Sequence, residues 1–184
     1  THAHVPETFP LPAAVKAQVL IGKRGRAGGI RLVNSRAEVE QAVHELMRME
    51  IGGYTVQTVL IEEQLDIERE MYLSIYLDKS YRSPAILASA LGGVDVEELP
   101  ESAFMRIPVH VFTGLRSYHI RCVQRVLELP TPSLDALDLT LTAMWKVFVD
   151  LNAELVEVNP LVLTRDGRLV IADAKVNIDD RVAA

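Results

Sequence analysis

Four polar side chains near the C-terminus have the types and spacing of a cation-binding site. Glu157 and Asn159 lie on one expected strand, and Asp173 and Lys175 lie on the next. Both segments are otherwise apolar, and a polar group buried without a partner costs roughly 2–7 kcal/mol. A hard cation that carries a phosphate group best offsets this cost, because such a cation takes carboxylate and amide oxygens as ligands.

A turn positions these side chains. Residues 165–167 end in glycine, which favours a three-residue hairpin loop in which Thr164 pairs with Arg168. The resulting pairs are Asn159 with Asp173 and Glu157 with Lys175. Because side chains alternate along a strand, all four share one face. By the same alternation, that face continues with Leu161, Leu163, Leu169 and Ile171, and the opposite, buried face carries Val156, Val158, Val162, Val170, Ala172 and Ala174.

The two pairs also have an interpretation without a ligand. Glu157 with Lys175 is then a cross-strand ion pair, and Asn159 with Asp173 a hydrogen-bonded pair. Such pairs contribute at most about 1 kcal/mol. That gain is small against the cost of burying four polar groups, so the pattern favours a site.

A glycine-rich loop, residues 22–29, is the second candidate. It joins two expected strands, 13–21 and 30–33, so it is neither a phosphate loop nor a dinucleotide turn that precedes a helix. Its glycines let backbone N–H groups approach phosphates, and Lys23 and Arg24 supply positive charge. A basic, solvated hairpin tip has the same composition, and both interpretations stay open.

Charged residues also mark the neighbouring strands. Lys16 lies in the middle of an apolar strand, where it either reaches the surface or meets a buried anion. Glu62 ends another apolar run, and Glu70 opens the strand after it. Carboxylates at strand ends suit ribose hydroxyls or cations, although exposed edge charges are the common alternative.

The elements around these residues predict a two-lobed α+β fold, divided into residues 1–65 and 66–184. Ser35 and Glu38 form a capping box that opens a helix, which Gly52–Gly53 ends. The other expected elements are strands at 55–62, 70–79 and 84–90 and helices at 115–129 and 133–152.

Bulk properties exclude several classes. The chain has 184 residues and a formal net charge of −6, which argues against nucleic acid as a partner. No segment has the length and apolarity of a membrane span or the pattern of a signal peptide. The single cysteine, Cys122, fits a reducing, cytoplasmic setting, and the five histidines lack metal-ligand spacing.

Taken together, five motifs resemble the nucleotide-binding region of the succinyl-CoA synthetase beta subunit family. In order they are residues 14–19, 22–35, 59–73, 88–97 and the pair 157–162 with 173–175. The resemblance implies a two-lobed ATP-grasp fold that holds ATP or ADP, or GTP or GDP, with Mg²⁺. The implied nucleotide contacts are Lys16, Lys23, Arg24 and Gly25 for the phosphates, and Glu62, Leu65 and Glu70 for the adenine and ribose. The implied Mg²⁺ ligands are Asn159 and Asp173.

The resemblance also implies partners. In the family, the nucleotide phosphorylates a histidine of an alpha subunit, the phosphoryl group passes to a carboxylic acid, and CoA displaces it. We therefore expect a cytoplasmic protein, or a mitochondrial matrix protein in a eukaryote, that binds Mg-nucleotide but lacks complete ligase turnover alone. Malate–CoA ligase and citryl-CoA synthetase subunits share these motifs, and a non-catalytic nucleotide-binding module is the competing class.

Two departures accompany the resemblance. Lys23 stands where the family usually has glycine, and the family's first helix and strand and its CoA-ligase domain have no counterpart in residues 1–184. We expect an ATP-grasp region truncated at both ends.

Overall fold

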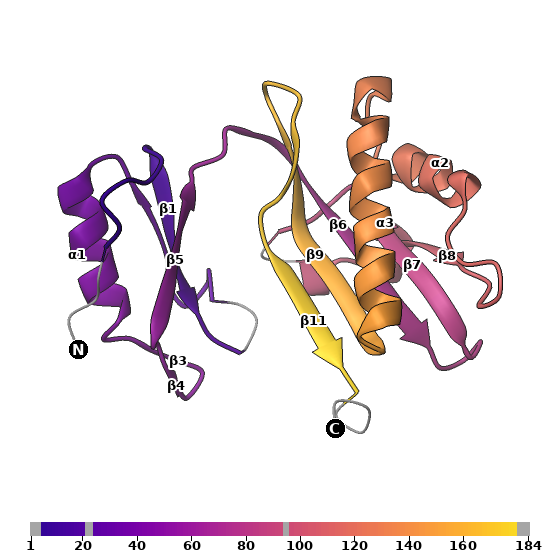
Figure 1. Cartoon of the computed structure of the whole chain (residues 1–184), viewed down its shortest axis with the longest axis horizontal. Helices are drawn as coiled ribbons and strands as arrows, with labels where there is room; N and C mark the ends of the chain where they lie inside the picture. The colour runs from indigo at the N-terminus through magenta and orange to yellow at the C-terminus, as the bar shows by residue number, and fades with distance from the viewer. Residues whose placement is uncertain (1–4, 21–23, 94–95, 180–184) are drawn as a thin grey trace. The chain divides into compact units, whose positions relative to one another are not determined.

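A computed structural model describes residues 5–20, 24–93 and 96–179 of the chain. The chain forms two compact units, Thr1–Leu65 and Asp66–Ala184 (Figure 1). We call them unit 1 and unit 2 and describe each by itself.

Unit 1 is a three-stranded antiparallel sheet with one helix on it. The sheet has the order β2-β1-β5, and a short hairpin, β3 and β4, follows the helix. The bounds are β1 Ala13–Gln18, β2 Ile30–Val33, α1 Arg36–Leu46, β3 Glu50–Ile51, β4 Tyr54–Thr55 and β5 Thr58–Glu63. Helix α1 begins where predicted, because the Ser35 side chain accepts a hydrogen bond from the Glu38 N–H. Its buried face packs on one side of the sheet, and no helix in the described residues of unit 1 covers the other side.

Two predictions in unit 1 were wrong. Helix α1 ends at Leu46, and Gly52–Gly53 instead form the turn between β3 and β4, where both have positive φ, +57° and +85°. Two consecutive residues with φ > 0 are the requirement of a tight hairpin turn. As a consequence, the strand expected at 55–62 is split, and β5 begins only at Thr58.

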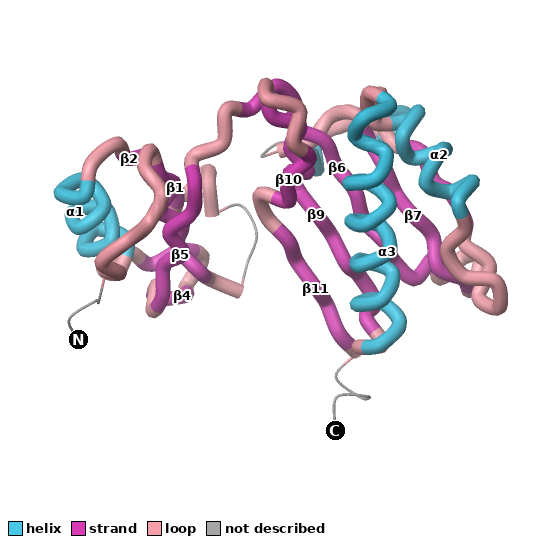
Figure 2. The backbone as a smooth tube through the Cα atoms, turned by 45° about the horizontal axis from the view of Figure 1, so that its top comes forward, coloured by secondary structure: helices cyan, strands magenta, loops and turns pink. Residues whose placement is uncertain are grey.

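Unit 2 is a six-stranded sheet covered on one face by two helices. The strand order is β10-β9-β6-β7-β8, with β11 also paired to β9, and α3 runs alongside β9 (Figure 2). The strands are β6 Ile67–Asp78, β7 Ser83–Ser89, β8 Met105–Pro108, β9 Ala153–Thr164, β10 Leu169–Ile171 and β11 Ala174–Ile178. The helices are α2 Ser117–Val126 and α3 Leu134–Asp150, with single 3₁₀ turns η1 Val96–Glu98, η2 Glu101–Ala103 and η3 Thr131–Ser133. In the part of the chain that the structure describes, no helix is long and apolar enough to cross a membrane.

The C-terminal hairpin has the predicted pairing. Thr164 N–H donates to the Arg168 carbonyl, and Asn159 N–H donates to the Asp173 carbonyl. Glu157 and Lys175 are register partners. The second strand is interrupted at residues 172–173, so that it forms β10 and β11 instead of one strand.

The predicted alternation along β9 fails at one point. Leu161 and Leu163 pack in the same core as Val156 and Val158, whereas they were expected on the polar face. The cause is a bulge, since the pairs Met71–Leu161 and Leu73–Val158 leave residues 159–160 opposite one residue of β6. One extra residue reverses the face of everything beyond it.

A buried histidine gives unit 2 a pH-dependent stability. His119 is fully buried, its Nδ1 accepts from the Arg116 N–H at 2.9 Å, and its Nε2 lies 3.3 Å from the Pro108 carbonyl. Burial lowers the pKa of His119, although both backbone hydrogen bonds oppose the shift. The unfolded chain therefore binds a proton near pH 6.5 that the folded chain refuses. The contribution of neutral His119 to the stability of unit 2 is therefore complete above that pH, and it is lost as the pH falls below it.

We expect the free energy of unfolding of unit 2 to fall between about pH 7 and pH 5, by at most about 1.4 kcal/mol per pH unit. Urea titrations followed by the fluorescence of Trp145, the single tryptophan, measure it. His119→Gln should flatten this slope, whereas His110→Gln, at an exposed histidine of the same unit, should not. Equal slopes for the wild type and His119→Gln would contradict the expectation.

Candidate functional site

The helix-free face of unit 1 carries a charged pair. Lys16 lies on β1 between Val15 and Ala17, which belong to the core under α1, so its side chain points to the other face. Its Nζ lies 2.6 Å from Glu62 Oε2 on β5, and the two side chains are 14% and 35% exposed. Glu62 Oε2 is buried and has no hydrogen-bond partner of good geometry, so its contact with Lys16 is an ion pair. Of the two options for Lys16, the structure shows the one with an anionic partner.

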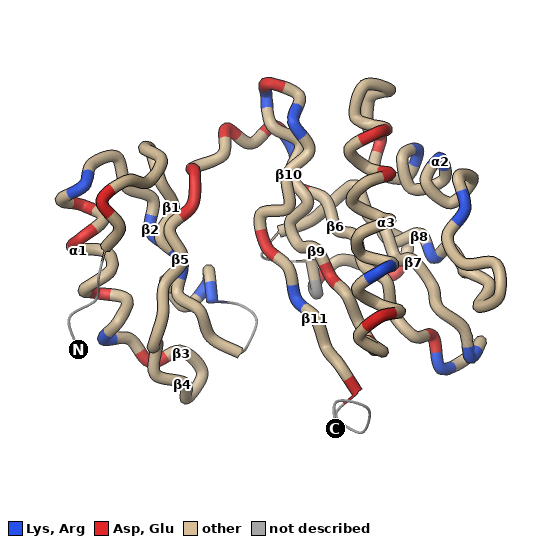
Figure 3. The backbone as a smooth tube through the Cα atoms, in the orientation of Figure 1, with Lys and Arg blue, Asp and Glu red and all other residues tan. Residues whose placement is uncertain are grey.

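Apolar side chains surround this pair. Ile30 and Leu32 on β2 and Leu60 on β5 share the face of Lys16 by strand alternation, and all three are exposed. Figure 3 shows acidic residues in red at the end of β5. Exposed apolar side chains beside a cation and a carboxylate combine the apolar and polar groups that are typical of ligand sites.

The glycine-rich loop is a β-hairpin connection, as predicted. Within its described part, the Arg24 guanidinium donates to the Ala17 carbonyl at 3.0 Å, and the Gly28 N–H donates to the Gly25 carbonyl. Arg24 thus binds the backbone of β1 in this structure. Lys23 lies outside the described residues. Leu65, expected near the adenine, is half-buried at the end of unit 1.

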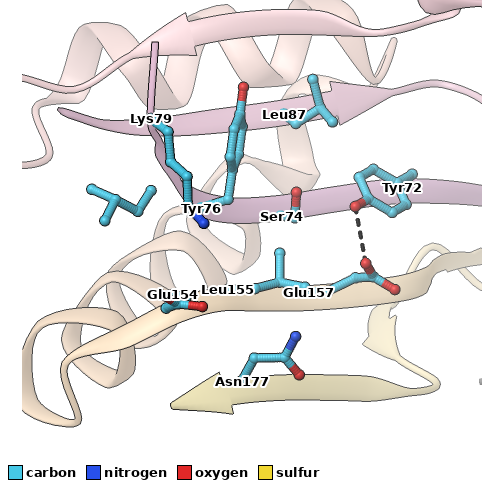
Figure 4. Close-up of a pocket in the computed structure, with 10 residues that line it drawn as sticks. Tyr72, Ser74, Tyr76, Lys79, Leu87, Glu154, Leu155, Glu157 and Asn177 are labelled. Atoms are coloured by element: carbon cyan, nitrogen blue, oxygen red, sulfur yellow. Dashed lines mark hydrogen bonds between the residues drawn. The ribbon is translucent and has the colours of Figure 1, made fainter. Parts of the chain in front are cut away.

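The face of the unit 2 sheet opposite α2 and α3 contains a cavity of about 360 Å³. Figure 4 shows the polar side chains that line it. They are Tyr72, Ser74 and Tyr76 from β6, Glu154 and Glu157 from β9, Asn177 from β11, and Lys79, which follows β6. The Tyr72 hydroxyl donates to Glu157 Oε2 at 3.0 Å. Burial is the main cause that raises the pKa of Tyr72 far above its usual value, so this phenol stays a donor.

Asn159 is held by a backbone segment distant in sequence. Its Oδ1 accepts from the Gly93 N–H at 2.7 Å, and its Nδ2 donates to the Gly93 carbonyl at 3.2 Å. Glu70 also lies close to this glycine, because a Cβ at Gly93 would stand 2.5 Å from Glu70 Oε2. The structure therefore brings Glu70 and Asn159 to one glycine turn. Sequence reasoning missed this role, and Gly92–Gly93 after an expected strand was the available signal.

Asp173 lies beside Asn159 through their backbone hydrogen bond, and its Oδ1 accepts from the Ala174 N–H. No ion pair joins Glu157 to Lys175 in the described structure, where Glu157 binds Tyr72 instead. Across residues 5–20, 24–93 and 96–179, no three His, Cys, Asp or Glu side chains gather as metal ligands. An amide oxygen and one carboxylate still fit Mg²⁺, which takes few protein ligands and completes its octahedron with water and phosphate.

Comparison of the sequence with known proteins identifies its family. The sequence model of the ATP-grasp domain matches residues 6–163. The chain is 45% identical to succinate–CoA ligase (ADP-forming) subunit beta 2 of Streptomyces coelicolor, over 91% of this chain and 44% of that protein. It is 43% identical to the subunit beta of Desulfurococcus amylolyticus, over 90% and 45%. The chain thus spans about half the length of these relatives.

Solved structures agree on the fold. ATP citrate lyase from Methanothrix soehngenii, in complex with citrate and coenzyme A, matches with a TM-score of 0.69 and 25% identity, over 92% of this chain and 39% of that one. A dinucleotide forming acetyl-coenzyme A synthetase from Ca. Korarchaeum cryptofilum matches with a TM-score of 0.69, over 93% and 78%, and at 16% identity shows the fold alone. These matches confirm the α+β ATP-grasp prediction and the likeness to succinate–CoA ligase beta subunits. The chain belongs to the ATP-grasp family.

Proposed function

We propose that the chain is the nucleotide-binding part of an acid–CoA ligase beta subunit. Its task is to hold Mg-ATP or Mg-ADP while a phosphoryl group passes between the nucleotide and a histidine of an alpha subunit, with a carboxylic acid and CoA as further substrates. The identity of 43–45% with two named succinate–CoA ligase subunits supports succinate as the acid. The similarity to ATP citrate lyase makes citrate the second candidate.

One observation carries the proposal. Asn159 on β9 and Asp173, in the break between β10 and β11, are neighbours joined by a backbone hydrogen bond in an otherwise apolar hairpin, and Glu157, two residues from Asn159, lines a cavity. In the proposal, Asn159 and Asp173 hold Mg²⁺, which supplies charge stabilisation to the transferring phosphoryl group. Glu157 lines the cavity, which in the proposal receives the acceptor group.

Residues outside the C-terminal hairpin supply the other nucleotide contacts in the proposal. Lys16 neutralises phosphate charge as a point cation. The loop residues Lys23, Arg24 and Gly25 approach the same phosphates, which requires Arg24 to exchange the Ala17 carbonyl for a phosphate oxygen. The remaining contacts, to the adenine and ribose, fall to Glu62, Leu65 and Glu70.

Titration calorimetry with Mg-ADP tests the proposal. We expect the wild-type chain to bind and Asp173→Ala to bind at least about tenfold more weakly, because one of two protein ligands of the metal is lost. Asp135→Ala removes an exposed carboxylate from α3 in the same unit and should bind as the wild type does. Absence of binding by the wild type, or formation of acyl-CoA by this chain alone, would contradict the proposal.

A further inference from the structure

The side chain of Asn159 uses both of its polar atoms on the backbone of one residue, Gly93. The amide oxygen accepts from the Gly93 N–H at 2.7 Å and the amide nitrogen donates to the Gly93 carbonyl at 3.2 Å. Reversing the amide would face donor to donor and acceptor to acceptor, so the orientation is fixed. A carbonyl oxygen has two lone pairs, and Gly93 engages one of them at Oδ1.

The Gly92–Gly93 turn packs closely against β6. Gly93 has φ +94°, and a Cβ there would lie 2.5 Å from Glu70 Oε2. At Gly92 a Cβ would lie 2.4 Å from the backbone of Met71, a fully buried residue of β6. The turn therefore lies directly on the first half of β6, and Asn159 on β9 must match a fixed donor and a fixed acceptor.

We propose that the Gly92–Gly93 turn is a positioning element that orients the amide of Asn159 and selects an amide over a carboxylate at this position. A carboxylate accepts but does not donate. One oxygen of an aspartate would take the Gly93 N–H, and the other would face the Gly93 carbonyl oxygen. The turn thus excludes the residue that would otherwise bring more negative charge to a divalent cation.

An aspartate at position 159 should weaken Mg²⁺ binding, although carboxylates are ordinarily good ligands of this cation. This expectation rests on the proposed function, in which Asn159 is a ligand of Mg²⁺. The orientation of the amide by Gly93 does not depend on it and is measurable in metal-free protein.

The experiment compares Asn159→Asp with the wild type, and uses Asn152→Asp as the control. Asn152 is an exposed residue of unit 2 with φ +48°, a conformation that Asn and Asp both adopt. In metal-free protein, hydrogen exchange of the Gly93 amide should be slow in the wild type and in the control, and at least about tenfold faster in Asn159→Asp. Mg-ADP affinity should fall by about tenfold in Asn159→Asp alone.

The outcomes separate the two ideas. Fast exchange of the Gly93 amide in the wild type overturns the positioning inference without any variant. Unchanged exchange with equal or tighter Mg-ADP binding by Asn159→Asp overturns it as well. If the exchange results hold but the wild type binds no Mg-ADP, the inference stands and the proposed function fails.

Discussion

Replacing Gly92 with alanine should destabilise unit 2 by about 3 kcal/mol, at the upper end of the cost of inserting a methyl group into a packed interior. The new Cβ would lie 2.4 Å from the carbonyl carbon and oxygen of Met71 and 2.8 Å from its Cα. The backbone of Met71 cannot shift easily, because Met71 is fully buried and its strand pairs with β9 at Leu161. Urea unfolding, followed by the fluorescence of Trp145, gives the free-energy change.

Gly167 provides a matched control in the same unit. It has φ +85°, and a Cβ there would have no atom within 4 Å. Gly167→Ala should therefore cost only the backbone penalty of a left-handed residue, about 1–2 kcal/mol. Equal losses at the two positions would mean that the contact with Met71 is not the cause.

The hairpin register was predictable because it is a local property. A glycine at the end of a three-residue loop sets the pairing of Thr164 with Arg168, and the pairs as far as Leu155 with Asn177 follow from it. Asn159 therefore meets Asp173 as expected. The capping box at Ser35 and Glu38 was predictable for the same reason, because all its atoms lie within one turn of helix.

The error along β9 was avoidable. Pro160 has no N–H to donate, and proline within a sheet is confined to edges and bulges. Here β9 has neighbours on both sides, β6 on one and β10 with β11 on the other, so a bulge beside Pro160 was the expected solution. Treating the strand as an unbroken alternation placed Leu161 and Leu163 on the wrong face.

The contacts that shape the candidate site were beyond any local pattern. Asn159 and Gly93 are 66 residues apart in sequence, and Tyr72 and Glu157 are 85 apart. Neither spacing has a periodic signature, because such contacts depend on the order in which β6, β7 and β9 join the sheet. Motif resemblance pointed to Asn159 and Glu157 as candidates, and the structure shows which groups they contact.

The second large effect is expected at Lys16. We expect Lys16→Met to weaken Mg-ADP binding by about a hundredfold, which corresponds to the loss of one charged contact of roughly 3 kcal/mol with phosphate. Methionine keeps most of the apolar length of lysine, so the packing on β1 is retained. Calorimetry on the variant and the wild type measures the ratio of dissociation constants.

Stability must be separated from binding at this position, because Lys16→Met also removes the ionic partner of Glu62, whose Oε2 is buried. The double variant Lys16→Met/Glu62→Gln removes that unpaired charge. If Lys16 acts on the phosphates directly, the double variant regains thermal stability while its Mg-ADP affinity stays about a hundredfold below that of Glu62→Gln alone, the reference that accounts for the proposed ribose contact of Glu62. Recovery of affinity along with stability would instead show that Lys16 serves only to neutralise Glu62, and would remove it from the proposed phosphate site.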